Sequence, residues 1–469
     1  MRVFCAPRMS KDQKLIDLET KPMAALLAQY SLPAIVGMTA MSLYNMVDAI
    51  YIGKCCGAFA IAAMALVFPI MNLTIAFGTL VGLGSAAAAS IALGQHDFNR
   101  AFRVLGHCAV MGAIFGVLIG WVPLLWLDEL LLFFGASANT LEPARDFTLI
   151  MLLGFPLSST FMNFNHLMRA SGYPGKAMVS LLISMVVNIG CAHLFVYELG
   201  WGMIGAGLAT VAAQAVGLCW VLNHLLRRSS VLHFKSHIYK LSGPIVRRIC
   251  TIGLPPCLLN AAGCLCIVVF NYQLRAYEGD IGMGAFGVVN RIVFTFVMVV
   301  LGITQGMQPI AGYNLGLGNT ARVKRVLYYA MAAATVITTA AWGVMELFPQ
   351  ELARLFAREE DAESARLIDL AAEGVRLLVL IFPLVGSQIV ISNFFQAIGR
   401  PLMSILLNLS RQFILLIPAL FLLPPLLGSR GIWLAQAAAD AVSVLMGFIV
   451  LYLFITRYLN HSSSANTTS

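Results

Sequence analysis

Charged and titratable side chains are scarce in this chain, and a few of them fall inside long apolar segments. Those that do are Asp48, His193, Arg291, Arg376, Arg411 and Asp440. A charge at the centre of a lipid bilayer costs at least about 2.5–3.5 kcal/mol, so each such residue needs a functional or a structural reason. A buried carboxylate can bind a proton near neutral pH, because burial disfavours its charged form. These residues are the candidates for binding or moving cations.

Asp48 is the strongest of these candidates. Tyr44 lies one helical turn earlier on the same face, so its hydroxyl can reach the carboxylate. Pro33 removes a backbone hydrogen bond upstream and allows this helix to bend. The pattern favours a cation-coupling site at Asp48. The alternative is an interfacial acid that caps a loop or pairs with Lys54.

Asn188 and Thr210 fall in two later apolar segments at a depth similar to that of Asp48. Carboxylate, amide and hydroxyl oxygens at one depth could hold a sodium ion or a protonated network. The alternative is ordinary hydrogen bonding between helices, which is common for Asn and Thr in membranes. His193 titrates near neutral pH when unperturbed, so it joins the coupling candidates, although a lone histidine is more often a packing residue.

Asp440 and Arg411 lie near the middle of two neighbouring antiparallel segments, so a buried ion pair is the default interpretation. The alternative is that Asp440 lines a cavity and meets a cationic substrate. Asn271 and Gln305 join Asp440 and Arg411 as candidates for such a cavity. Arg291 and Arg376 are expected to extend toward the interface or to pair locally.

The composition requires a membrane to accommodate these segments. Hydrophobic residues make up 59% of the 469 positions and charged residues 11%, against about 25% charged residues in soluble domains. The ten cysteines form no C-x-x-C or Cys/His metal spacing, and no zinc-protease or nucleophile-elbow motif occurs. We therefore expect no enzyme, no cofactor and no resident metal, with Na⁺ entering only as a coupling ion.

Twelve stretches reach the roughly 20 apolar residues that a transmembrane helix needs. They span about 25–52, 60–92, 102–126, 145–169, 177–197, 203–226, 247–274, 282–312, 324–348, 372–398, 402–423 and 431–456. The acidic segment 351–373 has an amphipathic pattern and is expected to form a surface helix. Flexing points are expected at six prolines: Pro33, Pro69, Pro156, Pro255, Pro309 and Pro383.

The first half of the sequence recurs in the second. At an offset of 222 residues, the matching elements are Ser31-Leu32-Pro33 with Gly253-Leu254-Pro255, Leu93-Gly94 with Leu315-Gly316, and Arg100 with Arg322. At an offset of 227 residues, they are Phe155-Pro156-Leu157 with Phe382-Pro383-Leu384, Gly172 with Gly399, and Pro174 with Pro401. The sequence therefore predicts an all-α membrane protein with twelve transmembrane helices in two pseudo-symmetric six-helix lobes, enclosing a cavity.

The positive charges predict the orientation of these lobes. Twenty of the 30 Lys and Arg residues fall in the termini and the even-numbered loops, which places both termini in the cytoplasm of a multi-pass plasma-membrane protein. The expected domains are a tail (1–24), the N-lobe (25–226), a linker (227–246), the C-lobe (247–456) and a second tail (457–469). The net charge of +9 is explained by this topology, so no nucleic-acid partner is expected.

Several of these residues resemble a known family. The Val47-Asp48 element and Gln305-Gly306-Met307-Gln308-Pro309-Ile310-Ala311-Gly312-Tyr313-Asn314 are similar to the multidrug and toxic compound extrusion (MATE) family. Ser410-Arg411-Gln412 and Phe395-Gln396-Ala397-Ile398-Gly399 resemble its MepA-like branch. The resemblance covers nearly the whole chain. It implies two lobes that open outward and export cationic amphipathic drugs against a proton or sodium gradient, from a chain that we expect to act as a monomer among membrane lipids.

The resemblance also implies roles for single residues. Asp48 matches the family's cation-linked carboxylate on helix 1, and Asn188 and Thr210 match its Asn and Thr on helices 5 and 6. Where many members carry Asp-Pro after this Asn, the chain has Ala192-His193, so a second acid is absent. This departure favours proton over sodium coupling, or a site to which His193 contributes.

Three other functions remain open at this stage. A flippase for lipid-linked precursors would share the two-lobed architecture, but it would need a basic cavity. A channel would need a filter loop, and none is visible in the sequence. A membrane enzyme would need a catalytic motif in the membrane segments. The sign of the charge that lines the cavity separates the antiporter from the flippase.

Overall fold

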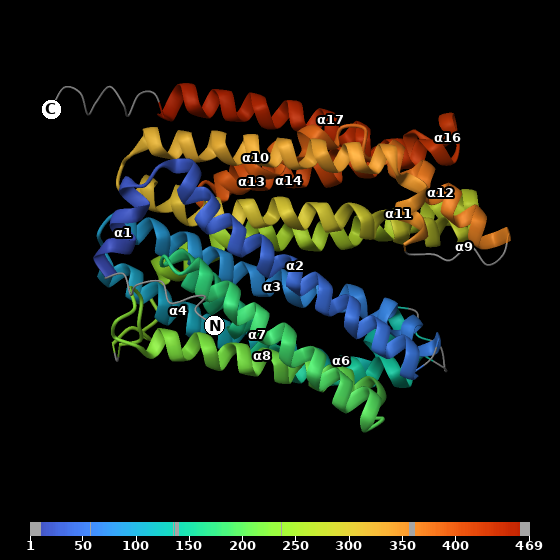
Figure 1. The fold of residues 1–469 in the computed structure, drawn as a ribbon, viewed down its shortest axis with the longest axis horizontal. Helices are drawn as coiled ribbons and strands as arrows, with labels where there is room; N and C mark the ends of the chain where they lie inside the picture. The colour runs from blue at the N-terminus through green and yellow to red at the C-terminus, as the bar shows by residue number, and fades with distance from the viewer. Residues whose placement is uncertain are drawn as a thin grey trace, which may run out of the picture.

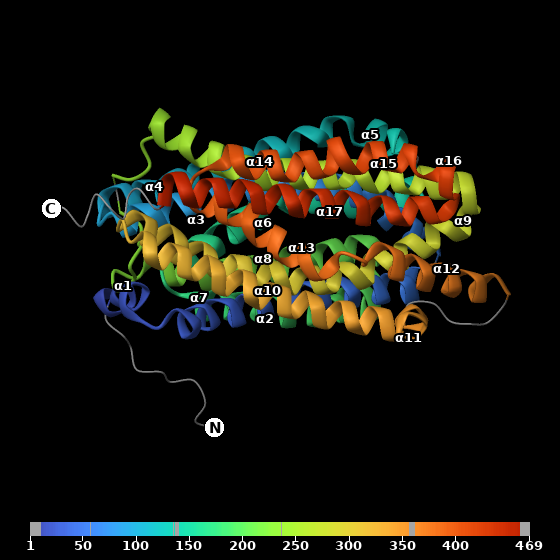
Figure 2. The same cartoon turned by 90° about the horizontal axis from the view of Figure 1, so that it is seen from above.

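The protein is a bundle of long helices in two halves. The structure, a computed structural model, describes residues 11–56, 58–134, 136, 140–235, 237–355 and 362–459, and no strand occurs among them. In Figure 1 the first half of the chain, blue to green, forms the lower layer, and the second half, yellow to red, forms the upper one. Figure 2 shows that the helices of both halves run along a common axis. The two halves are the predicted N-lobe and C-lobe.

The N-lobe contains eight α-helices and two short non-α segments among its described residues. They are α1 (Lys11–Thr20), α2 (Met23–Cys56), α3 (Ala58–Gly94), α4 (Phe98–Trp121), a 3₁₀ segment (Val122–Trp126), α5 (Leu127–Phe133), α6 (Leu141–Ala170), α7 (Pro174–Ala192), a π-helical segment (His193–Glu198) and α8 (Gly202–Leu226). The first of these lies within the predicted N-terminal tail. It packs through buried Leu15 and Leu18, so this part of the tail belongs to the folded core.

The described residues of the C-lobe form nine α-helices and two π-helical segments. They are α9 (Gly243–Gly316), α10 (Thr320–Leu347), α11 (Pro349–Arg354), α12 (Ala362–Leu378), α13 (Phe382–Ala397), α14 (Pro401–Leu409), a π-helical segment (Ser410–Leu416), α15 (Ile417–Leu422), α16 (Pro424–Leu427), α17 (Ser429–Phe454) and a terminal π-helical segment (Ile455–Leu459). Helix α9 contains two spans, Gly243–Gly279 and Ile281–Gly316, which meet where Gly279 adopts a positive φ of 67°. Glycine tolerates this conformation because it has no Cβ.

Eleven described helices are long and apolar enough to cross a membrane, and a twelfth span arises if one bent pair is counted as a single crossing. The bent pair is α12 with α13, which meet at 61°. Many large apolar side chains are exposed on the outer surface, such as Val336, Leu402 and Ile414. A surface of this kind is stable against lipid tails but not in water. The chain is therefore a multi-pass membrane protein.

The predicted boundary of the tenth span differs from the structure. The sequence suggested a surface helix over 351–373 followed by one span over 372–398, whereas α12 runs to Leu378 and the break falls at residues 379–381. Residues Ile368 and Val375 of α12 are buried in the C-lobe core, so this amphipathic helix packs as part of the bundle. Pro383, one of the six predicted flexing points, follows the break directly, because its ring conflicts with the carbonyl four residues earlier.

The two lobes meet most closely at the end of the bundle that carries the turns at 95–97, 171–173, 317–319 and 398–400, which we call the basic end. A side chain at Gly94 of α3 would overlap the carbonyl oxygen of Tyr313 in α9, and one at Gly253 of α9 would overlap that of Leu80 in α3. The two helices thus touch backbone to backbone. Gln308 adds a cross-lobe hydrogen bond from Nε2 to the carbonyl oxygen of Leu83, at 3.3 Å.

A methyl group in this seam should disturb it. Gly253→Ala is expected to lower the apparent melting temperature of the purified protein by several degrees, because the new Cβ meets backbone that cannot rotate away. Gly263→Ala, on the same helix with open space around it, is the matched control and should be neutral or stabilising by up to about 1 kcal/mol. Equal melting temperatures for the two variants would contradict the close contact.

Candidate functional site

Asn188 and Thr210 form a buried polar pair in the N-lobe. Asn188 lies on α7 with 1% of its surface exposed, and Thr210 lies on α8 with 5% exposed. The Asn188 Nδ2 donates to Thr210 Oγ1 at 3.4 Å, and Thr210 Oγ1 donates to the Ala206 carbonyl at 3.2 Å. The structure thus joins two residues that the sequence placed at one depth. Neutral oxygens held in an apolar bundle can accept a proton-bearing or cationic group.

Two further polar residues extend this pair, and sequence reasoning missed them. Gln214 follows Thr210 by one helical turn on α8, and its Oε1 accepts a hydrogen bond from Ser158 Oγ of α6. Ser158 also donates to the Gly154 carbonyl at 3.1 Å. The spacing of Thr210 and Gln214, four residues apart on one helix face, is the signal that could have found them. Polar side chains therefore run from α7 through α8 to α6.

Asp48 and Tyr44 lie on α2, but their side chains are outside the described residues, so their predicted roles rest on where the helix places them. Near its C-terminal end α2 packs against the π-helical segment His193–Glu198, where Tyr51 Oη lies 3.5 Å from His193 Nδ1. Because α2 and α7 run in the same direction, residue 48 lies about two residues, or roughly 3 Å along the axis, from the level of Asn188. Along the bundle axis, residue 48 and the polar pair therefore lie at levels less than one helical turn apart.

His193 occupies the outer end of this region. It opens the π-helical segment His193–Glu198, and its side chain is 52% exposed. Its Nε2 lies 3.5 Å from Glu198 Oε1, and its ring stacks on Tyr197. None of these contacts among the described residues reaches Asn188 or Thr210. The acidic group beside His193 is therefore Glu198, and the structure does not join His193 to the Asn188–Thr210 pair within the described part of the chain.

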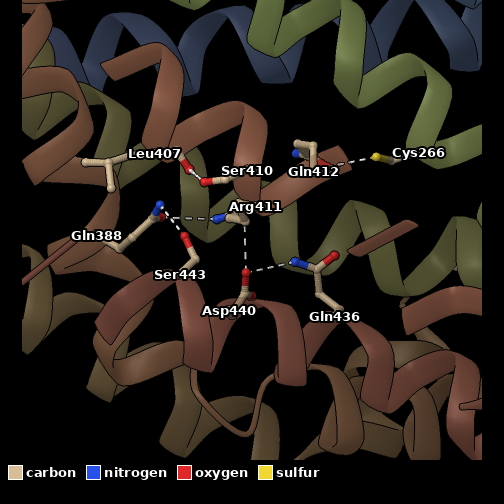
Figure 3. A network of polar contacts seen from close by, with 9 residues as sticks. All are labelled: Cys266, Gln388, Leu407, Ser410, Arg411, Gln412, Gln436, Asp440 and Ser443. Atoms are coloured by element: carbon tan, nitrogen blue, oxygen red, sulfur yellow. Dashed lines mark hydrogen bonds and ion pairs between the residues drawn. The ribbon is translucent and has the colours of Figure 1, made fainter. Parts of the chain in front are cut away.

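The C-lobe contains a second polar network, drawn in Figure 3. Arg411 Nε lies 3.4 Å from Asp440 Oδ1, and the Asp440 residue is 6% exposed. Asp440 Oδ1 also accepts from Gln436 Nε2 at 3.0 Å. Arg411 Nη1 donates to Gln388 Oε1 at 3.3 Å, and Gln388 Nε2 donates to Ser443 Oγ at 2.9 Å. The two charges thus form a buried ion pair with neutral polar neighbours on each side.

Local backbone geometry positions Arg411. Residues Ser410–Leu416 form a π-helical turn inside the eleventh span, and wide turns of this kind often occur at functional sites. The turn directs Arg411 to Gln388 and Asp440, while Gln412 Oε1 accepts from Cys266 Sγ of α9 at 2.8 Å. No sequence pattern predicted this turn. Gln388, Gln436 and Ser443 were also missed, because single neutral polar residues in membrane helices are common.

The other two cavity candidates lie outside this network. Gln305 of α9 is half-buried at the contact between the lobes, and its Nε2 lies 3.2 Å from Met38 Sδ of α2. Its Oε1 is buried without a hydrogen-bond partner among the described residues. Asn271 is half-buried on α9 and makes no hydrogen bond to Arg411 or Asp440 within the described part of the chain. Of these two candidates, Gln305 is the one that contacts the opposite lobe within the described part of the chain.

These features define a class of protein. Two related bundles of membrane-spanning helices, each with a buried polar cluster at its interior, form the architecture of secondary transporters. A model of the family described as MatE matches residues 33–194 and 255–422. The chain belongs to the MatE family, as its sequence motifs indicated.

Relatives of similar length share the whole fold. Multidrug export protein MepA of Staphylococcus haemolyticus is 24% identical over 447 residues, covering 95% of this chain and 97% of the relative. MepA of Staphylococcus aureus is 23% identical over 451 residues, with the same coverage. A MOP superfamily transporter from Pyrococcus furiosus superposes with a TM-score of 0.89 at 24% identity, covering 94% of this chain and 98% of that one. A multidrug resistance MATE family transporter, solved in an outward-facing conformation, gives 0.87 over 97% and 98% of the two chains.

Proposed function

We propose that this chain is an antiporter that exports cationic amphipathic compounds, driven by inward proton movement. Its named relatives are multidrug export proteins that match it over 95% of its length. The observation that carries the proposal is the buried Asn188–Thr210 pair, which lies within one turn of the level of Asp48 on the adjacent helix α2. A lone carboxylate beside neutral polar groups is suited to reversible protonation.

In this proposal Asp48 takes up the coupling proton, and Tyr44, Asn188 and Thr210 provide its polar partners. Loss of the negative charge would change those partners and shift α2, which carries Pro33 inside it as a proposed flexing point. A proton is favoured over sodium because Ala192 stands where a second acid would supply another anionic ligand. His193 is assigned a lesser part, since it pairs with Glu198 at the outer end.

Alternating access would come from the lobes rocking about their shared seam. The seam at the basic end is closed by direct contact between α3 and α9, and that end carries most of the positive charge that predicts a cytoplasmic location. We assign the drug-binding surface to the interior between the lobes, where Gln305 of α9 contacts Met38 of α2. The Arg411–Asp440 network lies within the C-lobe. The three membrane arginines do not converge on a basic cavity, because Arg291 and Arg376 are exposed and Arg411 is paired. This arrangement favours a cationic drug over a lipid pyrophosphate.

Dye transport in inverted membrane vesicles tests this proposal. Ethidium should accumulate inside the vesicles when their lumen is made acidic, because protons then leave the lumen through the antiporter as ethidium enters it. Each charge moved through 100 mV contributes about 2.3 kcal/mol, or roughly a fiftyfold gradient. A sodium gradient imposed alone should give no accumulation above that of vesicles without the protein. Accumulation driven by sodium alone would replace the proton in this mechanism, and accumulation driven by neither ion would overturn the antiporter assignment.

A further inference from the structure

Three arginines gather around one hollow at the basic end of the bundle. The hollow measures about 300 Å³, and Arg100, Arg247 and Arg248 line it together with Thr251, Gly399 and Pro401. Arg100 comes from α4 of the N-lobe, and the other two come from the first turns of α9 in the C-lobe. The hollow therefore lies across the boundary between the lobes, outside the two polar clusters described above.

The positive charge in this hollow is not balanced by the protein. Among the described residues, none of the three guanidinium groups forms an ion pair or a side-chain hydrogen bond. Asp97, the acid nearest in sequence, uses its Oδ1 to accept from the backbone N–H of Arg100 and is exposed. Arg100 and Arg248 are both half-buried and lie close enough to repel each other. Partly buried like charges are unfavourable unless an opposite charge joins them.

The internal repeat supplies a natural control for this site. Arg322 is the repeat counterpart of Arg100, and Pro22 that of Pro244 at the start of α9. Arg322 Nη2 donates to the carbonyl oxygens of Leu18 at 3.3 Å and Lys21 at 2.8 Å. The Leu18 carbonyl lies in the last turn of α1 and the Lys21 carbonyl directly after it, where the helix dipole is negative. At this counterpart site, the chain itself supplies the acceptors for the guanidinium.

The hollow around Arg100 differs from the counterpart site around Arg322 in two ways. The positions of Arg247 and Arg248 correspond to Ala25 and Leu26 in the first copy, so two positive charges have replaced two apolar side chains. Among the described residues, the segment before α9 provides no carbonyl oxygen as an acceptor to Arg100; instead the Ser242 N–H donates to His107 Nε2 at 2.7 Å. The hollow thus has more positive charge than its counterpart, and within the described part of the chain its guanidinium groups have no acceptor.

We propose that this hollow binds a phosphate group, which bridges Arg100 of the N-lobe to Arg247 and Arg248 of the C-lobe. Guanidinium groups bind phosphate oxygens with paired, charge-assisted hydrogen bonds. The phosphate belongs either to the headgroup of a membrane lipid or to a soluble anion, since the hollow lies at the ends of the membrane-spanning helices. Because its ligands come from both lobes, a bound phosphate stabilises the arrangement in which this end is closed.

Binding to the purified full-length protein tests the site. In the lipid arm, native mass spectrometry compares phosphatidylglycerol with phosphatidylcholine. In the soluble arm, the melting temperature is compared in inorganic phosphate and in chloride at equal ionic strength. We expect the combined Arg100→Gln and Arg248→Gln variant to bind the preferred probe at least about tenfold more weakly, the loss expected from one charge-assisted bond. Arg228→Gln removes an exposed arginine at the same end and should leave binding unchanged.

Each outcome bears on the proposal. Selective retention of phosphatidylglycerol supports a lipid headgroup, and a melting shift in inorganic phosphate supports a soluble anion. In phosphatidylcholine and chloride, the double variant should melt at or above the temperature of the unaltered protein, because repulsion between like charges is relieved. This melting temperature is the control that the double variant folds. The site would be disproved by binding that survives the double variant, by an equal loss in Arg228→Gln, or by no preference for either phosphate probe.

Discussion

Asp48→Asn should lower gradient-driven efflux by at least about tenfold and remove its dependence on the proton gradient. The substitution keeps the size and polarity of the side chain but removes the group that binds and releases a proton, and an intramembrane acid is the expected place for that group. The measurement is the initial rate of ethidium uptake into inverted vesicles at several imposed pH gradients. Binding of ethidium to the purified variant should persist, because the proposed drug surface lies elsewhere.

Two matched variants make this result specific to Asp48. Asp48→Glu keeps an ionisable carboxyl group and should retain part of the coupled transport. Asp128→Asn removes an acid from the same lobe, where Asp128 pairs with Arg145 at 3.2 Å on the exposed surface. Exposed pairs of this kind contribute about 0–1 kcal/mol, so this variant should transport normally. An Asp48→Asn protein that pumps at full rate, with its proton dependence unchanged, would defeat the coupling assignment.

The overall fold was accessible from the sequence because a membrane leaves few alternatives. Backbone polar groups must be satisfied within each helix, so long apolar runs can be converted directly into spans. The internal repeat then fixed the grouping into two lobes, and the match of Gly94 with Gly316 marked residues that meet the opposite lobe. These predictions rest on local composition and on a repeat that is visible in one sequence.

The features that sequence could not supply depend on tertiary packing. Helix α12 carries Arg366 and Glu373 on an amphipathic surface, which suggested an interfacial helix, yet its apolar face packs in the C-lobe core. The first of these charges pairs with Glu278 at 3.0 Å and the second with Arg430 at 2.6 Å, so both are satisfied at the edge of the bundle. The π-helical turn at Ser410–Leu416 was not predicted either, although Pro418 follows its end by two residues.

The candidate sites were predictable to different degrees. Arg411 and Asp440 are charges in apolar surroundings, and their positions along antiparallel helices were enough to suggest the ion pair that the structure contains. Asn188 and Thr210 were suggested by depth and by family resemblance. Gln214, Gln388 and Gln436 gave no comparable signal, since a neutral amide costs little to bury when it finds a partner. Which amides join a network depends on helix rotation, which one sequence does not specify.

The buried pair in the C-lobe should produce the largest stability effect. Arg411→Met leaves Asp440, which is 6% exposed, with Gln436 as its one hydrogen-bond partner among the described residues. Breaking a buried ion pair by removing one partner costs about 3–5 kcal/mol, because the remaining charge is uncompensated. The apparent melting temperature of the Arg411→Met protein should therefore fall strongly, and Asp440→Leu should have an effect in the same direction by stranding the guanidinium.

The double variant Arg411→Met with Asp440→Leu separates a structural role from a functional one. Replacing both charges by apolar side chains of similar volume removes the uncompensated charge, so the melting temperature should return to within a few degrees of the unaltered protein. If the pair only joins the π-helical turn to α17, ethidium efflux should recover together with stability, and this is the expected result. A double variant that melts normally but no longer exports ethidium would instead place Asp440 in contact with the transported cation. Stability would then depend on the pairing of Asp440 with Arg411, whereas transport would depend on the negative charge of the carboxylate itself.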